Sequence, residues 1–473
     1  MARDPDDRSI PRSRVARSSR VGMLAGVEGA RFAGTKAANL VRSRAKGQER
    51  MDARALESAE KLVDALGTLK GAAMKMGQLA SFIDTEYLPD EYRELYQEKL
   101  GKLRTSAPSM PWDKVRKVLD QEYDEPYEEL FSDFETQAFA AASIGQVHRA
   151  SLPDGRRVAV KIQYPGIDAA IRADLSNAGM ILRFAKALAP GLDAKAVAEE
   201  LKERVLEELD YEYEAQNQRT FARAYRDHPF IYVPDVVTRL SRNRVLVTEC
   251  VDGIGFDEVK QLDAESRSRF GEIVFRFYLG SIYQLQHFNA DAHPGNYLLM
   301  NDGRVAFLDF GMTKRLDRDQ IELEIEVVKA RVDGDPERLR EKLHDLGFVK
   351  NPQRIDAERL LEHVDAVGGW YWEDCEREIT PEYVMSVITA ISDPRSDFFS
   401  LMRRENVPAN ELMGRRMEIG VLAVLGQLRA RRNWHRIARE WWFHDDPSTD
   451  LGREEWDFWE RRGGVWGVRE RQR

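Results

Sequence analysis

The sequence predicts an α+β fold of two lobes, a small lobe with an antiparallel sheet and a larger, mostly helical lobe. Three observations lead to this prediction. Residues 139–162 read as strand, turn and strand around Pro153-Asp154-Gly155. Residues 318–440 carry mostly helical patterns. Between these parts, a polar loop at 289–296 precedes an apolar strand at 305–309, where chemistry-bearing residues gather.

Composition describes an ordinary soluble globular protein. The chain has 473 residues, of which 42% are hydrophobic and 32% are charged, enough for two or more domains. Its two cysteines, Cys250 and Cys375, form no disulfide framework and no structural metal site, so we expect a reducing, cytoplasmic setting. No apolar run reaches the ~18 residues of a membrane span, and no signal peptide is recognisable.

Charge is unevenly distributed along the chain. Residues 1–50 hold twelve Lys and Arg against five Asp and Glu, a local charge of +7 within a chain of net charge −9. We interpret 1–50 as a basic N-terminal arm that is partly disordered or lies on an anionic membrane surface through residues 20–45. The arm lacks interleaved aromatic residues and the remainder is acidic, so nucleic acid is not an expected partner.

A helical extension is predicted at 51–130. Apolar residues recur at three- and four-residue intervals from Ala55 to about Ile83, and a second helical pattern covers 111–122. Lys75 and Gln78 share one side of the first helix, away from its apolar stripe. Gly77 costs ~1 kcal/mol in a helix interior, so close approach by another group is a plausible reason for it. A solvated helix edge is the alternative.

The small lobe is assigned to 131–253. After the strands 144–152 and 157–162, helices are expected at about 168–189 and 194–226. Two further strand candidates, 233–240 and 244–249, precede the larger lobe.

The larger lobe is assigned to 254–440. It opens with a helix at about 263–288, followed by the polar loop and the 305–309 strand. The remaining 441–473 form a Trp-rich tail that reads as a packing or docking segment.

The polar loop and the strand carry the strongest chemical signal. Asp291 stands five residues before Asn296, and Asp309 opens an Asp-Phe-Gly motif at the end of the strand. A kinase-type site uses this order: one carboxylate near the phosphoryl acceptor, and an Asn and a second Asp that hold Mg²⁺. We therefore expect Asp291 to orient the acceptor and Asn296 and Asp309 to bind the metal.

Lys161 would contact the phosphates of a nucleotide, because it ends a Val-Ala-Val-Lys strand upstream of Asp291. Such a lysine needs a carboxylate partner, which should come from the helix over 194–224. On a continuous helix Glu207, Asp210 and Glu214 fall on one face, so spacing alone leaves the partner open.

The expected phosphate loop departs from the glycine-rich loop of protein kinases. Ala140 and Ala142 replace the first two glycines, whereas Gly145 and Val147 keep their places. Alanine limits close backbone approach to phosphate, so the nucleotide pose should differ. We count Ala140, Ala142, Ser143, Gly145 and Val147 as nucleotide-binding candidates, and the later residues Glu249 and Val251 belong to the same set.

These motifs together resemble the UbiB/AarF family of atypical, protein-kinase-like proteins over roughly residues 55–315. Lys75-Met-Gly77-Gln78 is similar to the family's K-x-G-Q signature, and Ala140 to His148 to its alanine-rich loop. Glu208-Leu-Asp210 matches its E-x-D motif, and the resemblance makes Glu214 the partner of Lys161. It implies a kinase-like fold with extra N-terminal helices over the site.

The resemblance also implies a lid in which Lys75, Gln78, Glu208 and Asp210 form a network. No convincing Ala-Pro-Glu motif follows Asp309-Phe-Gly, which argues against a peptide platform. Two residues depart from the family pattern: Asn289 stands where His is usual, and Ala292 where Pro is common. The usual His supports the loop, so Asn289 bears on the loop's conformation.

The predicted function is that of an ATP- and Mg²⁺-binding atypical kinase or ATPase acting on an unknown small-molecule or lipid acceptor. The resemblance connects this activity to isoprenoid quinone or lipid metabolism, at the inner face of a membrane. One alternative is a non-catalytic, nucleotide-gated pseudokinase that chaperones a hydrophobic ligand or partner. A conventional Ser/Thr protein kinase is a weaker alternative, because the loop glycines and the Ala-Pro-Glu motif are missing.

Overall fold

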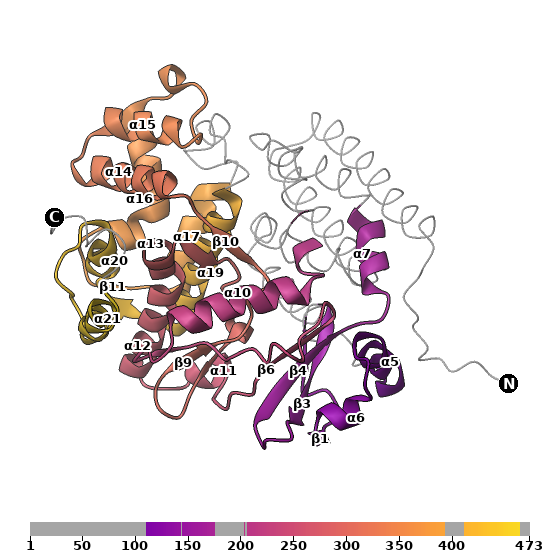
Figure 1. The fold of residues 1–473 in the computed structure, drawn as a ribbon. Helices are drawn as coiled ribbons and strands as arrows, with labels where there is room; N and C mark the ends of the chain where they lie inside the picture. The colour runs from indigo at the N-terminus through magenta and orange to yellow at the C-terminus, as the bar shows by residue number, and fades with distance from the viewer. Residues whose placement is uncertain (1–109, 143, 176–202, 204–205, 393–410, 464–473) are drawn as a thin grey trace, which may run out of the picture.

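The computed structural model describes residues 110–142, 144–175, 203, 206–392 and 411–463. The predicted basic arm, the helix at 55–83 with Lys75, Gly77 and Gln78, and Ser143 lie outside these residues. In Figure 1 the sheet of the small lobe lies at the lower right and the helical lobe at the left. Helix α10 (Tyr211–Ala224) runs across the middle between them.

The small lobe is an antiparallel sheet covered by two short helices. Its elements are α5 (Trp112–Glu122), α6 (Tyr127–Leu130), β1 (Asp133–Phe134), β2 (Ala140–Ala141), β3 (Gly145–Ser151), β4 (Arg157–Gln163), α7 (Ile167–Leu175) and β6 (Val245–Glu249). The strand order is β1-β3-β4-β6, and β2 pairs with β3. Val158 and Val160 are buried against α5, as their alternation in the sequence predicts.

The helical lobe begins with a helical run that leads to the loop around Asp291. Its first elements are β5 (Ile231–Tyr232), α11 (Phe256–Val259), α12 (Ala264–Phe275), the π-helix η1 (Arg276–Gly280), α13 (Ser281–Leu285), β7 (His287–Asn289), the 3-10 turn η2 (Pro294–Asn296), β8 (Tyr297–Leu299), β9 (Val305–Phe307) and β10 (Thr313–Arg315). Strand β9 lies between β5 and β8, and β7 pairs with β10. These pairings bring the Asp291 loop beside the Asp309 segment.

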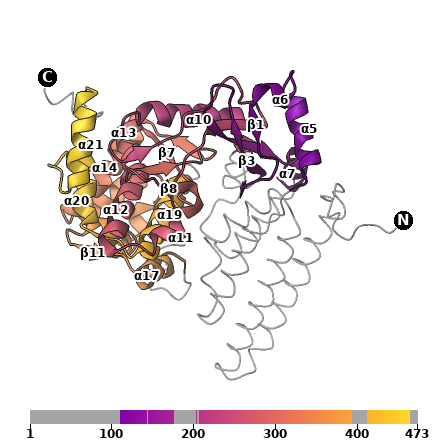
Figure 2. The ribbon, with the colours of Figure 1, turned by 90° about the horizontal axis from the view of Figure 1, so that it is seen from below.

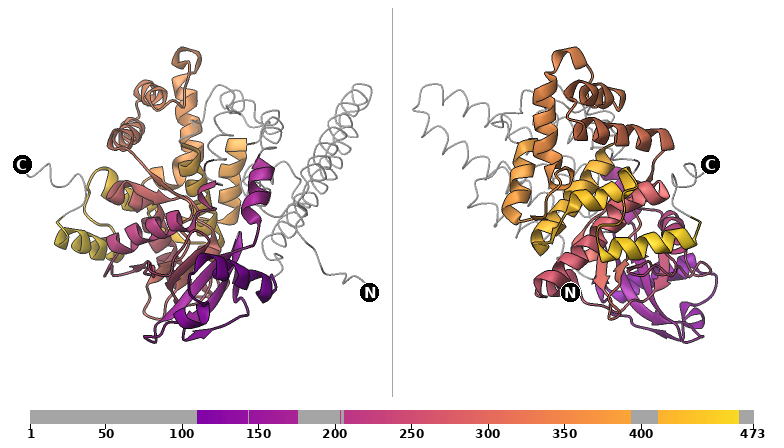
Figure 3. Two further views of the ribbon diagram at one scale, coloured as in Figure 1. Left: turned by 45° about the vertical axis from the view of Figure 1, so that its right-hand side comes forward. Right: turned by 90° about the vertical axis from the view of Figure 1, so that its left-hand side faces the viewer.

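The rest of the described part of this lobe is mostly helical, as predicted. It comprises α14 (Arg318–Val332), α15 (Pro336–Asp345), η3 (Pro352–Arg354), α16 (Ala357–Trp372), β11 (Arg377–Glu378), α17 (Pro381–Ser392), α19 (Leu412–Leu428), β12 (Arg431–Arg432), α20 (Trp434–Trp442) and α21 (Asp450–Arg461). Figure 3 shows these helices from two sides. Trp441, Trp442 and Trp459 of the predicted tail are buried in the core of the lobe. Their role in the structure is therefore packing.

Three predicted elements differ from the structure. Residues 233–240 form no strand: Pro234 has no N–H to donate, the Leu240 N–H bonds to Val237 O in a turn, and only Val236 bridges to β6. The helix predicted to reach residue 288 ends at Leu285, because Gln286 has a φ of 53° and residues 287–289 form β7.

The third difference concerns the helix predicted over 194–224. The chain forms a turn at Glu208 and Leu209, and Asp210 caps the N-terminus of α10 by accepting from the Glu212 and Tyr213 N–H groups. The prediction that Glu207, Asp210 and Glu214 share one helical face is therefore wrong, because no single helix contains all three.

The fold-class prediction is confirmed for the described residues: an α+β structure with a small antiparallel sheet and a mostly helical lobe. No helix among the described residues has the length and apolar character needed to cross a bilayer.

Candidate active site

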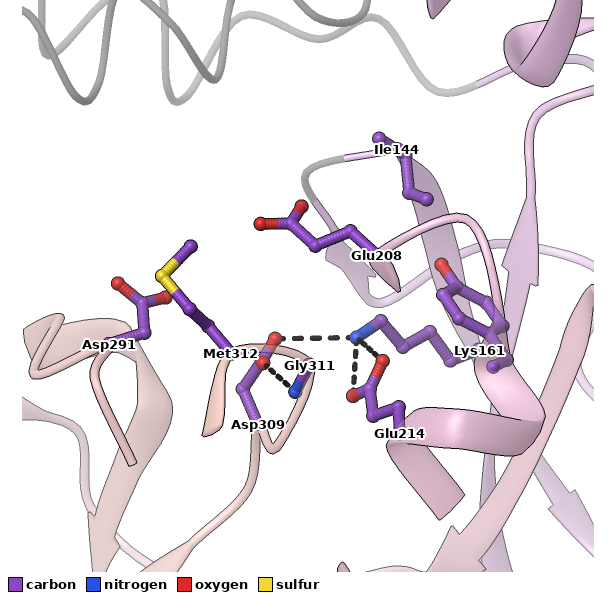
Figure 4. Close-up of a pocket in the computed structure, with 9 residues that line it drawn as sticks. Ile144, Lys161, Glu208, Glu214, Asp291, Asp309, Gly311 and Met312 are labelled. Atoms are coloured by element: carbon purple, nitrogen blue, oxygen red, sulfur yellow. Dashed lines mark hydrogen bonds and ion pairs between the residues drawn. The ribbon is translucent and has the colours of Figure 1, made fainter. Parts of the chain in front are cut away.

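Lys161 on β4 lies between two carboxylates. Its Nζ atom donates to both oxygens of Glu214 at 2.7 and 2.9 Å, and to Asp309 Oδ2 at 3.3 Å (Figure 4). The side chain of Glu214 is 3% exposed and that of Lys161 14%. The Tyr211 ring centre lies 5.0 Å from Nζ and covers the cation. The predicted Lys161–Glu214 pair is thus present, and Asp309 joins it.

Local structure explains how three distant residues meet. Alternation along β4 buries Val160 and Ile162 on one face and directs Lys161 to the other. The Asp210 cap begins α10 so that Glu214 lies in its first turn. Asp309 lies two residues after the end of β9, and its Oδ1 accepts from the Gly311 N–H at 3.0 Å. The position of each of these three side chains is therefore fixed by the strand, helix or turn that carries it.

Electrostatics favour a charged lysine at this position. Burial opposes the charge of Lys161, but the carboxylates of Asp309 and Glu214 outweigh it and raise its pKa well above the ordinary value. Burial also raises the pKa of Glu214 to about 7, although Lys161 acts in the opposite direction. The lysine is a fixed cation at neutral pH.

The loop predicted to carry the acceptor-orienting carboxylate is tightly tied. Asn296 Nδ2 donates to the main-chain oxygen of Asp291 at 3.2 Å and to its Oδ2 atom at 3.0 Å. His293 accepts from the Gly295 N–H at 3.0 Å and caps the turn η2. Arg416 of α19 donates to Asp291 Oδ1 at 2.7 Å. Asp291 therefore has a fixed orientation.

Asn289 joins this loop to the metal-ligand candidate. Its Nδ2 donates to the main-chain oxygen of Asp309 at 2.6 Å, and its Oδ1 accepts from the Asp291 N–H at 2.9 Å. The residue is 1% exposed. The resemblance leads us to expect His at this position, but the side chain of Asn289 contacts both segments and so supports the loop directly.

The Asp309-Phe310-Gly311 segment is anchored from the helical lobe. Phe310 is fully buried and contacts Phe221 and Phe277, and its main-chain oxygen accepts from Asn217 Nδ2 at 3.4 Å. Because Phe221 and Asn217 both belong to α10, the helix that carries Glu214 also fixes the position of Asp309.

One pocket collects these side chains (Figure 4). It is lined by Ile144, Lys161, Glu208, Tyr211, Glu214, Asp291, Asp309, Gly311 and Met312. Five of the predicted site residues are among them: Lys161, Glu208, Glu214, Asp291 and Asp309. Asn296 adjoins the pocket through Asp291. The two lobes thus contribute to one polar site.

Other predicted residues lie elsewhere. Asp210 does not line the pocket; it caps α10 and accepts from Asn243. Glu249 accepts from the hydroxyl of Tyr232, and Val251 follows β6 outside the lining. Glu208 of the E-x-D motif therefore lies in the pocket, whereas Asp210 of the same motif caps a helix.

The alanine-rich segment forms a tight hairpin beside the pocket. Ala140 pairs with Val147, and the Ala142 N–H bonds to Gly145 O at 2.9 Å. A Cβ atom on Gly145 would lie 2.2 Å from Ile162 O. Gly145 is therefore required for close packing of β3 on β4, a role distinct from the predicted phosphate contact.

Sequence reasoning missed several residues of this site. Arg416 lies 125 residues after Asp291, on a mostly apolar helix outside every recognised motif, so no local pattern marks it. Tyr211, Ile144 and Met312 each adjoin a recognised motif, and their positions next to Asp210, Gly145 and Gly311 were the available signal.

The two lobes and the pocket between them define a kinase-like protein. Residues 102–343 match the model of the ABC1 atypical kinase-like domain, and the chain belongs to this family. The predicted resemblance to UbiB/AarF proteins is thereby confirmed.

Individual relatives agree with this assignment. The chain is 33% identical over 322 residues to "Atypical kinase COQ8B, mitochondrial" of Rattus norvegicus, across 66% of this chain and 60% of that protein. It is 31% identical over 319 residues to "Atypical kinase COQ8, mitochondrial" of Saccharomyces cerevisiae, across 66% of this chain and 62% of that protein. The match thus spans about three fifths of each relative.

A solved structure is also similar. The Mycobacterium tuberculosis protein Rv3197, solved in complex with erythromycin, has a TM-score of 0.59 and 34% sequence identity to this chain. The match covers 81% of this chain and 95% of that one.

Proposed function

We propose that this protein binds Mg-ATP and acts as an atypical kinase or ATPase with a small-molecule or lipid acceptor. The observation that carries the proposal is the bridge of Lys161 between Glu214 and Asp309, at 2.7 and 3.3 Å. Kinase-type sites use such a lysine for the phosphates and such an aspartate for the metal. The alternative of an isolated structural ion pair does not account for Asp291 and Asn296 beside it.

The residues fit Mg-ATP by their chemistry. Asp309 and Asn296 offer the oxygen ligands that Mg²⁺ prefers, and Lys161 offers a fixed cation for phosphate. When bound, Mg²⁺ neutralises charge on the phosphate oxygens. Asp291 would orient the acceptor hydroxyl or a water, Asn296 holds Asp291 in place, and Glu214 positions Lys161.

The acceptor and the site of action follow from the resemblance. The acceptor would belong to isoprenoid quinone or lipid metabolism. The protein would act in the cytoplasm, peripheral to the inner face of a membrane. The lid network predicted from Lys75, Gln78, Glu208 and Asp210 belongs to the same proposal, although Asp210 itself caps α10 outside the pocket lining. Its supporting observation is Glu208, which lines the pocket with 7% of its surface exposed.

Nucleotide binding is tested by isothermal titration of the full chain with Mg-ATP and Mg-ADP. We expect saturable binding, and an absence of heat at millimolar nucleotide would reject the proposal. Asp309→Asn should abolish turnover while Asp302→Asn, an exposed aspartate in the turn between β8 and β9, leaves it unchanged. Equal ATP hydrolysis by Asp309→Asn and the wild type would reject the metal role.

The rival function, a nucleotide-gated module without phosphoryl transfer, is favoured by one contact. The carboxylate that would orient the acceptor is held by Arg416 at 2.7 Å. Single-turnover assays with labelled ATP, with and without vesicles of anionic lipid, distinguish the two. Phosphate release or lipid labelling supports the enzyme, and binding alone supports the module. Robust labelling of added protein substrates would support a conventional protein kinase instead.

A further inference from the structure

The last described helix, α21, lies against the end of α10, far from it in the sequence. Figure 2 shows α21 on the outer side of the helical lobe. Arg462, the residue after α21, donates from Nη1 to the main-chain oxygens of Arg223 and Ala224 at 3.2 and 2.7 Å. Its Nη2 donates to that of Arg226 at 2.7 Å. One guanidinium thus bonds to three main-chain carbonyl groups at and just beyond the C-terminus of α10.

These contacts satisfy groups that α10 cannot satisfy itself. The last carbonyls of a helix have no partner within it, and they carry the negative end of the helix dipole. A cation at this end stabilises the helix. Arg462 is held in place for this role, because its guanidinium lies 4.7 Å from the centre of the Phe458 ring, one turn earlier in α21.

Helix α21 is itself firmly attached to the helical lobe. Glu455 accepts from Arg276 Nη1 at 2.8 Å, and both side chains are at least 96% buried. Thr449 caps α21 and also accepts from Arg276 Nη2 at 2.9 Å. A Cβ atom on Gly452 would lie 2.7 Å from Arg276 Nη2, so the backbone of α21 packs closely against the Arg276 guanidinium. The helix provides a rigid base for Arg462.

Aromatic contacts extend the joint between the two helices. Trp459 meets Tyr225 edge-on with ring centres 6.0 Å apart, and Phe458 meets His228 at 4.5 Å. Tyr225 directly follows α10 in the chain, and His228 lies three residues further on. The C-terminal end of α10 is therefore held by both apolar packing and charge.

Helix α10 carries Glu214 in its first turn and spans about 21 Å at 1.5 Å per residue. A helix of this length moves as one body, so support at one end limits movement at the other. We propose that α21 is a latch that sets the position of α10, with Arg462 as its positioning residue for the Lys161–Glu214 pair. The link to nucleotide affinity rests on the function proposed above, whereas the latch itself does not.

The test compares Arg462→Gln with Arg461→Gln in the full-length protein. Arg461 is the matched control: it adjoins Arg462, and its Nε donates only to Asp457 O within α21 among the bonds described. Amide hydrogen exchange without nucleotide should be roughly two- to fivefold faster in 211–224 for Arg462→Gln, the change that a charge at a helix end contributes. The sheet of the small lobe should exchange as in the wild type.

Two further measurements complete the test. Arg462→Lys keeps the cation and should restore part of the protection of α10, and Mg-ATP should bind Arg462→Gln roughly two- to fivefold more weakly than Arg461→Gln. Equal exchange in both Gln variants, or equally faster exchange throughout Arg462→Gln, would overturn the latch. Faster α10 exchange with unchanged Mg-ATP affinity would overturn its link to Glu214. If the wild type binds no Mg-ATP, the proposed function fails and exchange alone decides on the latch.

Discussion

Arg416 of α19 donates from Nη2 to Asp291 Oδ1 at 2.7 Å, although 125 residues separate the two in the chain. The side chains are only 11% and 15% exposed, so solvent screens this ion pair less than a surface pair. The contact places a cation beside the carboxylate predicted to orient the acceptor. The helical lobe thus contributes to the site through a helix that no kinase motif marks.

In the proposed enzyme Arg416 orients Asp291, so replacing Arg416 with Gln should reduce turnover more than nucleotide binding; the rival module predicts no turnover in either protein. The change removes the cation beside Asp291 but leaves Lys161, Glu214 and Asp309 in place, so we expect at least a tenfold loss of ATP turnover, about 1.4 kcal/mol in the barrier. The Kd for Mg-ATP should stay within about twofold. Arg436→Gln, at an exposed position of α20, is the control. Full turnover by Arg416→Gln would contradict a role for this pair.

Asn289→Asp tests the support of the loop without a change of shape. The new carboxylate still accepts from the Asp291 N–H. It has no N–H to donate to Asp309 O, which accepts from Asn289 Nδ2 at 2.6 Å in the wild type. We expect the free energy of unfolding to fall by about 1–3 kcal/mol and Mg-ATP to bind more weakly. Denaturant titration and calorimetry measure the two effects. Asn301→Asp, in an exposed turn, should change neither; equal stability of both variants would show that the contact is dispensable.

Gly145→Ala should destabilise the small lobe. The added Cβ would lie 2.2 Å from Ile162 O on β4, and both atoms belong to paired strands that cannot separate freely. We expect a loss of about 1–3 kcal/mol in the free energy of unfolding. Gly414→Ala on α19 meets nothing within 4 Å and should be neutral or stabilising, because alanine favours helix. If the two variants unfold alike, Gly145 is not required for strand packing.

His287 should make the protein sensitive to mild acid. Burial, with help from Arg315, lowers the pKa of His287 to about 4, below the 6.5 of an exposed histidine. As pH falls, the unfolded chain therefore binds a proton at His287 before the folded protein does. The free energy of unfolding is unaffected by this histidine above pH 6.5 and decreases as pH falls from 6.5 toward 4. The loss is on the order of 3 kcal/mol for one such group. Denaturant unfolding at several pH values should give a shallower acid slope for His287→Gln, and parallel slopes would contradict this assignment.

The parts of the fold that sequence predicted are those with local signals. Turn residues at 153–155 and the alternation of Val158 and Val160 suffice to define the hairpin of β3 and β4. Periodic apolar residues likewise identify the helical lobe. Two of the wrong predictions, a continuous helix through Asp210 and a strand at 233–240, failed where a cap at Asp210 and a missing N–H at Pro234 override the pattern.

The sequence by itself determined the chemistry of the candidate site and the order of its parts, because Lys161, Asp291, Asn296 and Asp309 each stand in a short motif. Tertiary structure alone decided how they are held. The cap at Asp210 sets the start of α10 and so places Glu214, the predicted partner, against Lys161, and Arg416 and Arg462 reach the site and α10 from far along the chain. The reason is physical: ion pairs and hydrogen bonds between residues far apart in the chain form only once the helices have packed together. They produce no periodic pattern in the sequence.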